Sequence, residues 1–329
     1  MRKNYLLYFI LFVFMSSCYQ DRDDFLPDQI DDGGIVDDDM IDTGDDDNTD
    51  DDSEEEPDET NQFITDEGLV FYTGLECVGS GDYIIDRNNV LENLEIPETL
   101  ADSLDLSQYL PPIGDQGKQG SCTAWAVSYY MKSFQEILEN GLPIDSTNIK
   151  SPAYTYNQIT QGNCEGTVIE DHLKILKQQG VSSIKAFPYD DNTCREQPEE
   201  EIMELAADAK ISDYKSLSGE NMVEEMKTLL TQQTPIIIAA VLTKQFAKKD
   251  SFNLSAYREH NVEYTNPSCH AMLVVGYNDR YEAFKVVNSW GKNWGDEGFV
   301  WIDYKAFENV LKEDEAFRVI NSAVIAYDE

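Results

Sequence analysis

The spacing of apolar residues along this sequence changes at Pro235, and that change constrains the fold more than any other feature. Before Pro235, apolar residues recur at helical spacing, most clearly between Ser121 and Gly141. After Pro235, short runs rich in valine, isoleucine and phenylalanine alternate with turn residues, as they do in strands. Helices followed by strands predict an α+β protein with two lobes rather than alternating strand and helix units.

The expected helices and strands follow from these patterns. Helices are expected over residues 121–141, 168–179, 199–209 and 220–232. Strands are expected over residues 236–241, 270–276, 284–288 and 299–302. Residues 62–105 also have strand-like composition, and we interpret them as either a prosegment or an N-terminal extension of the main domain, residues 106–329.

Cys122 lies at the start of the longest expected helix. The unpaired N–H groups and the dipole at a helix N-terminus favour a thiolate over a thiol, so Cys122 is a candidate nucleophile. Gly117 and Gly120 suit a tight turn in which the backbone approaches a substrate closely. Position alone, however, does not distinguish this role from that of an inert, buried cysteine.

The chain contains three histidines, so few residues can serve as a base for Cys122. His172 lies inside an expected helix beside Asp171, and we interpret it as a surface residue. His260 lies in a polar loop and has no evident role. His270 begins an expected strand, where a histidine at the rim of one lobe can reach the other lobe. We therefore predict that His270 is the base.

The most specific motif is the block of residues 288–299, in which two tryptophans and three glycines occur at fixed spacing. This block resembles the Asn-Ser-Trp-Gly-x-x-Trp-Gly-x-x-Gly-aromatic motif of the papain family of cysteine peptidases, and it matches at every position. Residues 116–122 resemble the family's nucleophile motif, and residues 270–277 resemble its histidine strand. His270 follows Cys122 by 148 residues, within the roughly 130–150 expected for this family. The resemblance covers about residues 106–304.

This resemblance implies the papain-like fold, with a helical lobe that carries the nucleophile and a β-barrel-like lobe that carries the histidine and the asparagine. Cys122 and His270 would form a thiolate–imidazolium pair that attacks a peptide bond. Asn288 would orient the imidazole, and Trp290 would shield their hydrogen bond from water. Gln116 would complete the oxyanion hole beside the backbone N–H of Cys122. Neither a metal nor an organic cofactor is implied.

Residues 164–167 resemble the family's Cys-x-Gly-Gly loop, whose backbone pairs with the substrate. We accordingly assign Gly166, Thr167 and Trp290 to substrate binding. Thr167 replaces the second glycine of that loop, and Thr123 replaces the tryptophan that usually follows the nucleophile. Both departures bear on the shape of the binding subsites.

The cysteines allow several pairings. Gln119 replaces the cysteine that usually pairs with Cys164, and the resemblance then suggests Cys194 as the partner of Cys164. Cys77 and Cys269 are left over, and a bond between them would tie the N-terminal segment to the histidine strand. Four cysteines, those other than Cys18 and Cys122, permit three pairings.

The first residues predict export. Arg2 and Lys3 precede an apolar run over residues 5–15, which is too short to span a bilayer by itself. Residues 15–18 resemble a bacterial lipobox, so 1–17 would be a lipoprotein signal peptide and Cys18 a lipidated N-terminus. An ordinary signal peptide with an unmodified Cys18 is the alternative. The acidic residues after Cys18 resemble surface-export signals of bacterial lipoproteins, which predicts an outer-membrane anchor with exposure at the cell surface.

Residues 18–61 are expected to form an acidic, extended tether between the lipid and the folded domain. Residues 21–60 hold 21 acids and one base, and they supply about half of the net charge of −40. This acidity argues against nucleic acid and against electrostatic docking on a membrane. A calcium site in the tether is the alternative, although no regular loop spacing appears.

Two other functions remain compatible with parts of the sequence. One is an acyltransferase of the transglutaminase type, which uses a similar cysteine and histidine pair. The other is a surface-binding protein that kept the fold and lost turnover. Gln116 and the complete 288–299 block favour a peptidase that acts on proteins or peptides, as an endopeptidase or an exopeptidase.

Overall fold

The computed structural model describes residues 61–76, 86, 88–262, 268–308, 310 and 317–328, which all belong to one compact unit, residues 56–329. The apolar run, Cys18 and the acidic tether up to residue 60 lie outside these residues, as do Cys77 and the strand-like run at 83–85, so the predictions about them stay predictions. Among the described helices, none combines the length and the apolar character that crossing a bilayer requires.

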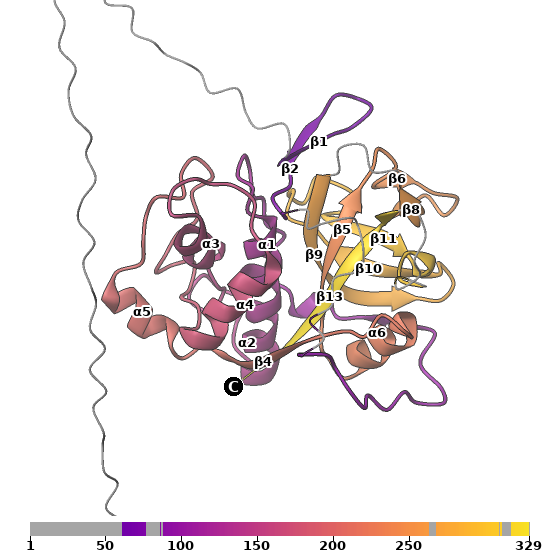
Figure 1. The fold of residues 1–329 in the computed structure, drawn as a ribbon, viewed down its shortest axis with the longest axis horizontal. Helices are drawn as coiled ribbons and strands as arrows, with labels where there is room; N and C mark the ends of the chain where they lie inside the picture. Colours follow the sequence, from indigo (N-terminus) through magenta and orange to yellow (C-terminus); the bar gives the residue numbers. More distant parts are fainter. Residues whose placement is uncertain are drawn as a thin grey trace, which may run out of the picture. The chain divides into compact units, whose positions relative to one another are not determined.

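The described chain forms a helical lobe and a sheet lobe (Figure 1), as an α+β papain-like fold requires. The helical segments are α1 (Cys122–Ala124), the π-helical segment η3 (Trp125–Lys132), α2 (Ser133–Asn140), α3 (Pro152–Thr160), α4 (Ile169–Gln178), α5 (Glu200–Ala206) and α6 (Met222–Thr231), with two short 3₁₀ turns, η2 (Ser107–Tyr109) and η4 (Tyr304–Ala306). The strands are β1 (Gln62–Ile64), β2 (Val70–Tyr72), β3 (Ser103–Asp105), β4 (Ile211–Ser216), β5 (Ile236–Leu242), β6 (Lys248–Lys249), β7 (Ser255–Tyr257), β8 (Asn261–Val262), β9 (Ser268–Asn278), β10 (Ala283–Val287), β11 (Phe299–Asp303), β12 (Phe317–Arg318) and β13 (Ile320–Asp328).

The helix predicted from Ser121 forms as one continuous run, because α1, η3 and α2 follow each other from Cys122 to Asn140. Gly141 ends it with φ at +59°, a left-handed conformation that glycine adopts without steric cost. Its side chains at Val127 and Phe134 are fully buried. The prediction of a long helix with Cys122 at its start is confirmed.

The sheet lobe is built around β9, the longest strand. The strands run in the order β4-β13-β5-β9-β10-β11-β7-β6, and β3 pairs with β9 beside this path. β9 is antiparallel to β5 and to β10, with Ala240 opposite His270 and Leu273 opposite Val287. Every residue of β5 is buried, as expected for a run that is apolar throughout. This arrangement brings the start of β9 close to the end of β10.

Several elements were not predicted from the sequence, among them α3, β4 and β13. Ser151 caps α3 by accepting a hydrogen bond from the N–H of Tyr154, and Pro152 occupies its first turn. β13 pairs with β4 on one side and with β5 on the other. It therefore joins the C-terminal end of the chain to the center of the sheet.

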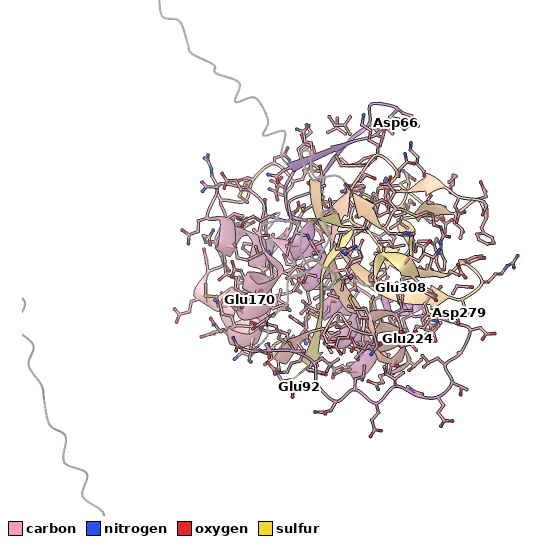
Figure 2. The ribbon with its side chains drawn as sticks, turned by 45° about the vertical axis from the view of Figure 1, so that its right-hand side comes forward. Asp66, Glu92, Glu170, Glu224, Asp279 and Glu308 are labelled. Carbon is pink, nitrogen blue, oxygen red and sulfur yellow. A yellow bond between two sulfur atoms is a disulfide. The ribbon has the colours of Figure 1, made fainter. Side chains whose placement is uncertain are left out.

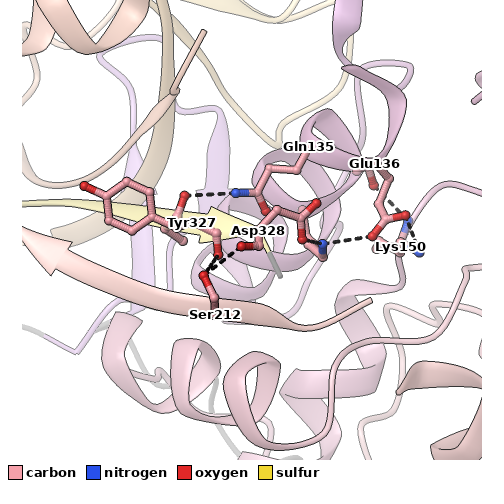
Figure 3. Close-up of polar contacts among 9 residues, drawn as sticks. Gln135, Glu136, Lys150, Ser212, Tyr327 and Asp328 are labelled. Atoms are coloured by element: carbon pink, nitrogen blue, oxygen red, sulfur yellow. Dashed lines mark hydrogen bonds and ion pairs between the residues drawn. The ribbon is translucent and has the colours of Figure 1, made fainter. Parts of the chain in front are cut away.

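The end of β13 is also tied to the helical run of α1, η3 and α2, which we call the nucleophile helix. Lys132, which is fully buried, forms ion pairs with Glu136, at 2.8 Å, and with Asp328 on β13. Gln135 donates a hydrogen bond from Nε2 to the carbonyl of Ala326 at 2.9 Å. Figure 3 shows this cluster, including Gln135, Glu136, Lys150, Ser212, Tyr327 and Asp328. Because a buried charge is costly without its partners, these contacts fix the helix against the strand.

Acidic side chains lie on several parts of the described domain. Figure 2 shows this distribution for Asp66, Glu92, Glu170, Glu224, Asp279 and Glu308. Several of them are paired with lysines, for example Asp66 with Lys248 at 2.6 Å and Glu170 with Lys174 at 3.2 Å.

Candidate active site

The predicted residues Cys122, His270 and Asn288 come from three elements that meet between the lobes. Cys122 begins the nucleophile helix, His270 is the third residue of β9, and Asn288 directly follows β10. The Sγ of Cys122 accepts a hydrogen bond from the N–H of Ala271, the residue after His270, at 3.4 Å. The nucleophile candidate therefore lies against the histidine strand.

His270 and Asn288 form a short hydrogen bond between Nε2 and Oδ1, at 2.6 Å. Oδ1 also accepts from the N–H of Ser289 at 2.7 Å, which fixes it as the acceptor. Because an amide oxygen only accepts, Nε2 of His270 donates a proton to it, and in a neutral imidazole Nδ1 then keeps a free lone pair. That Nδ1 has no hydrogen-bond partner among the described residues. The imidazole is thus oriented with Nδ1 unpaired.

Cys122 and His270 are both fully buried, and burial sets their protonation. Burial raises the pKa of the Cys122 thiol to about 12, and the Ala271 N–H opposes this only in part. Burial lowers the pKa of His270 to about 4. The sequence predicted an activated thiolate, but in this state desolvation outweighs the helix N-terminus. Burial thus favours a thiol on Cys122 and a neutral imidazole on His270.

Gln116 is positioned by pairing between its loop and the segment after β10. Its N–H donates to the carbonyl of Ser289 at 2.8 Å, and its Oε1 accepts from the Ser289 hydroxyl at 2.6 Å. The opposite end of the amide, Nε2, therefore faces the site, where it donates to the carbonyls of Gln119 and Thr73. The Thr73 carbonyl, at 2.8 Å, occupies the donor on which an oxyanion hole would depend.

Thr73 belongs to an N-terminal segment that lies over the site, residues 61–76, which we call the strap. The strap bonds to both lobes: the carbonyl of Gly74 accepts from the N–H of Thr167 at 2.8 Å, and the N–H of Leu75 donates to the carbonyl of Cys269 at 3.3 Å. We call the space between Thr167 and Cys269 the cleft. Because the strap fills it, the side chains of Cys122, His270 and Gln116 are completely inaccessible.

Gly74 lets the strap pass close to the nucleophile turn. Its φ is +119°, and a Cβ at this position would lie 2.0 Å from the backbone of Gly120. On the other side of the strap, a Cβ on Gly166 would lie 3.1 Å from the Gly74 carbonyl. Glycine at these positions allows three backbone segments to meet.

Trp290 packs on His270 and also binds the strap. Its ring centroid lies 4.6 Å from that of His270, so it covers the imidazole from one side. Its Nε1 donates to the carbonyl of Tyr72 at 2.7 Å, and its ring stacks on Phe71 and Phe63 of the strap.

Among the described residues, no group of three or more metal-binding side chains is arranged to hold a metal ion.

The predicted substrate loop lies beside the strap, and Thr167 pairs with it in parallel fashion. The carbonyl of Thr167 accepts from the N–H of Glu76 at 3.1 Å. The predicted disulfide between Cys164 and Cys194 is present. Cys269 is also disulfide-bonded, whereas its predicted partner, Cys77, lies outside the described residues.

The interpretation of His172 as a surface residue is wrong, because its side chain is fully buried. Its ring nitrogens bond to the hydroxyls of Thr167 and Thr155, both at 2.8 Å. Helical spacing could have revealed this burial, since His172 lies three residues after Ile169 and four before Leu176, which are both buried on the inner face of α4. The adjacent Asp171 obscured the pattern.

Comparisons with known proteins agree with this geometry. Residues 99–319 match the family model described as papain family cysteine protease, a range that begins after the strap. Mouse cathepsin K is 27% identical over 245 residues, which cover 71% of this chain and 68% of cathepsin K. A peptidase C1-like protein of Acanthamoeba polyphaga mimivirus is 26% identical over 226 residues, 64% of this chain and 71% of that protein.

Solved structures give the same fold. Xylellain, a cysteine protease from Xylella fastidiosa, superposes with a TM-score of 0.63 at 22% sequence identity, covering 78% of this chain and 97% of xylellain. Digestive procathepsin L 3 of Tenebrio molitor superposes with a TM-score of 0.55 at 18% identity, covering 75% and 77% of the two chains. With the sequence match over residues 99–319, these results show that the chain belongs to the papain family of cysteine proteases.

Proposed function

We propose that this cysteine peptidase hydrolyses peptide bonds with Cys122 as nucleophile, His270 as base, Asn288 as the residue that orients His270, and Gln116 as an oxyanion donor. The observation that carries the proposal is the state of His270. Its Nε2 is committed to Asn288 at 2.6 Å, and its Nδ1 has no partner within the described residues. The free lone pair therefore belongs to the nitrogen that can accept the thiol proton.

The chemistry follows from these atoms. The Cys122 thiol gives its proton to Nδ1 of His270, and the sulfur attacks the carbonyl carbon of the substrate. Gln116 Nε2 donates to the oxyanion that forms on the carbonyl oxygen. The imidazolium then protonates the leaving amine, which departs and leaves a thioester. Water, deprotonated by Nδ1, hydrolyses the thioester and releases the carboxylate product and the thiol.

We further propose that the strap acts as a prosegment that blocks this reaction. A substrate carbonyl needs the Gln116 amide, which the Thr73 carbonyl occupies, and it needs access to Cys122, which is fully buried. Displacing the strap would rehydrate the site. Since burial is the main cause of the raised pKa of Cys122 and of the lowered pKa of His270, both would return toward their ordinary values. Proton transfer between them would become easier.

The test uses Gly74→Val, which prevents the strap from seating because the new side chain would clash with Gly120. We expect an epoxide that alkylates papain-type thiols to label this variant at least about tenfold faster than the wild type, and we expect peptide cleavage to appear in parallel. The matched control is Gly68→Asn, also in the strap, where φ is +80° and no atom lies within 4 Å of the new Cβ.

Gly68→Asn should behave like the wild type, and Cys122→Ala combined with Gly74→Val should be neither labelled nor active. A folded Gly74→Val protein that is labelled no faster than the wild type would count against the blocking role. Rapid labelling without any cleavage of a peptide library would count against the peptidase site itself. The two proposals are thus separable.

We also propose that the protein is exported and anchored by a lipid on Cys18. The support is the sequence alone: a basic start, an apolar run over residues 5–15 and the lipobox-like residues 15–18. Mass spectrometry of the mature N-terminal peptide should show acyl mass on Cys18. Cys18→Ser should move the protein from the membrane fraction to the soluble fraction; an unchanged distribution would contradict the anchor.

A further inference from the structure

A buried chain of hydrogen bonds links the helical lobe to the peptide-pairing edge of the cleft. His172 on α4 bonds to Thr167 through Nε2 and to Thr155 on α3 through Nδ1, and Thr155 bonds to Ser128 on the nucleophile helix at 2.8 Å. All four side chains are buried. Figure 1 shows α3 and α4 in the helical lobe, where they pack against each other and against the nucleophile helix.

Hydroxyl groups satisfy both ring nitrogens of His172. Because a hydroxyl can donate or accept, a neutral imidazole with a single proton makes both bonds, whichever nitrogen carries the proton. Burial favours that form, because it lowers the pKa of His172 to about 3.

A second contact connects Thr167 to the nucleophile. The hydroxyl of Thr123, the residue directly after Cys122, donates to the carbonyl of Thr167 at 3.3 Å. The same carbonyl accepts from Glu76 of the strap, and the N–H of Thr167 donates to Gly74. The two departures from the family motifs, Thr123 and Thr167, therefore contact each other. The side chains of His172 and Thr123 thus bond to Thr167, while its backbone N–H and carbonyl pair with the strap in the cleft.

We infer that His172 is a positioning residue of the cleft: its bonds to Thr155 and Thr167 hold the Thr167 backbone at the depth where a peptide chain pairs with it. The strap is the chain that pairs there in this structure. A substrate would use the same N–H and carbonyl after the strap leaves, and in this respect the inference rests on the proposed function. His172 contacts no reacting atom and acts only through Thr167.

The first test measures the pairing without any turnover. In a Cys122→Ala background, amide hydrogen exchange is compared at Thr167 and Glu76, whose N–H groups bond across the cleft edge. His172→Phe keeps the ring volume but removes both nitrogen contacts, and Thr155→Val removes the anchor of the ring. We expect exchange at both amides to become about tenfold faster in each variant.

The controls separate positioning from general destabilisation. Thr155→Ser keeps the hydroxyl and should restore protection to within about twofold of the parent. Thr228→Val makes the matched substitution at a fully buried threonine whose hydroxyl has no partner among the described residues, and it should leave both amides unchanged. Equal loss of protection in Thr228→Val, or unchanged exchange in His172→Phe, would overturn the inference.

The second test uses catalysis in the Gly74→Val background. His172→Phe should raise KM for a peptide substrate about tenfold and change kcat by less than about twofold, because backbone pairing binds the substrate and the transition state alike. A fall in kcat with unchanged KM would contradict a positioning role. If the chain cleaved no peptide at all, the exchange experiment would still decide the inference, so failure of the proposed function is distinguishable from failure of this one.

Discussion

The two lobes each bury one histidine, and the two histidines differ in how their ring nitrogens are bonded. His172 in the helical lobe and His270 in the sheet lobe are both fully buried, and burial lowers the pKa of each, to about 3 and about 4. Both nitrogens of His172 bond to threonine hydroxyls. His270 has one nitrogen bonded to Asn288, and the other has no partner among the described residues.

This difference shows that a lowered pKa by itself does not identify a base. A buried imidazole with both nitrogens satisfied has no lone pair to offer, so it can only support neighbouring groups. A buried ring nitrogen without a hydrogen-bond partner lowers the stability of the fold, so its presence in a native structure calls for an explanation such as a catalytic role. In the proposed mechanism, that role is to accept the proton of the Cys122 thiol. Under the two proposals above, the comparison assigns chemistry to His270 and support to His172.

The largest expected effect comes from removing the free nitrogen. In the Gly74→Val background, His270→Ala should lower kcat about 10³-fold or more, because the thiol loses its proton acceptor. His172→Phe in the same background should leave kcat within about twofold. Steady-state kinetics with one peptide substrate, on variants shown to be folded by circular dichroism, check both values. Comparable losses of kcat in the two variants would break the comparison.

The parts of the site that could be predicted are those recorded in local sequence. Gly141 and the apolar spacing predicted the nucleophile helix, and the residues 288–299 block predicted where Asn288 and Trp290 would lie. The pairing of Cys164 with Cys194 followed from the family resemblance and is present. The domain boundaries and the roles of the site residues stay predictions.

The parts that could not be predicted depend on contacts between distant segments. The strap reaches Gln116 through the backbone carbonyl of Thr73, a group that every residue has and that no sequence pattern marks. The raised pKa of Cys122 follows from this burial, so the local argument from the helix N-terminus gave the wrong direction. His172 was different, since the spacing from Ile169 to Leu176 marked its face and was overlooked.

A smaller effect should distinguish the two histidines through stability. Between pH 6.5, the ordinary pKa, and the lowered folded value, the unfolded chain binds one more proton at each site than the folded chain. Stability from each neutral histidine is therefore fully present above about pH 6.5 and is lost as the pH falls, by about 1.4 kcal/mol per pH unit. The loss should continue to about pH 3 for His172 but only to about pH 4 for His270.

Denaturant unfolding of Cys122→Ala against pH measures this. Adding His172→Phe or His270→Phe should each reduce the slope between about pH 4.5 and 5.5 by the equivalent of one proton. All three proteins should have the same slope between about pH 7.5 and 8, where both imidazoles are neutral in the folded and unfolded chains. An unchanged acid slope in His172→Phe would mean that His172 is not buried as a neutral residue. The comparison would then fail for His172, because it requires a neutral imidazole with both nitrogens bonded to hydroxyls.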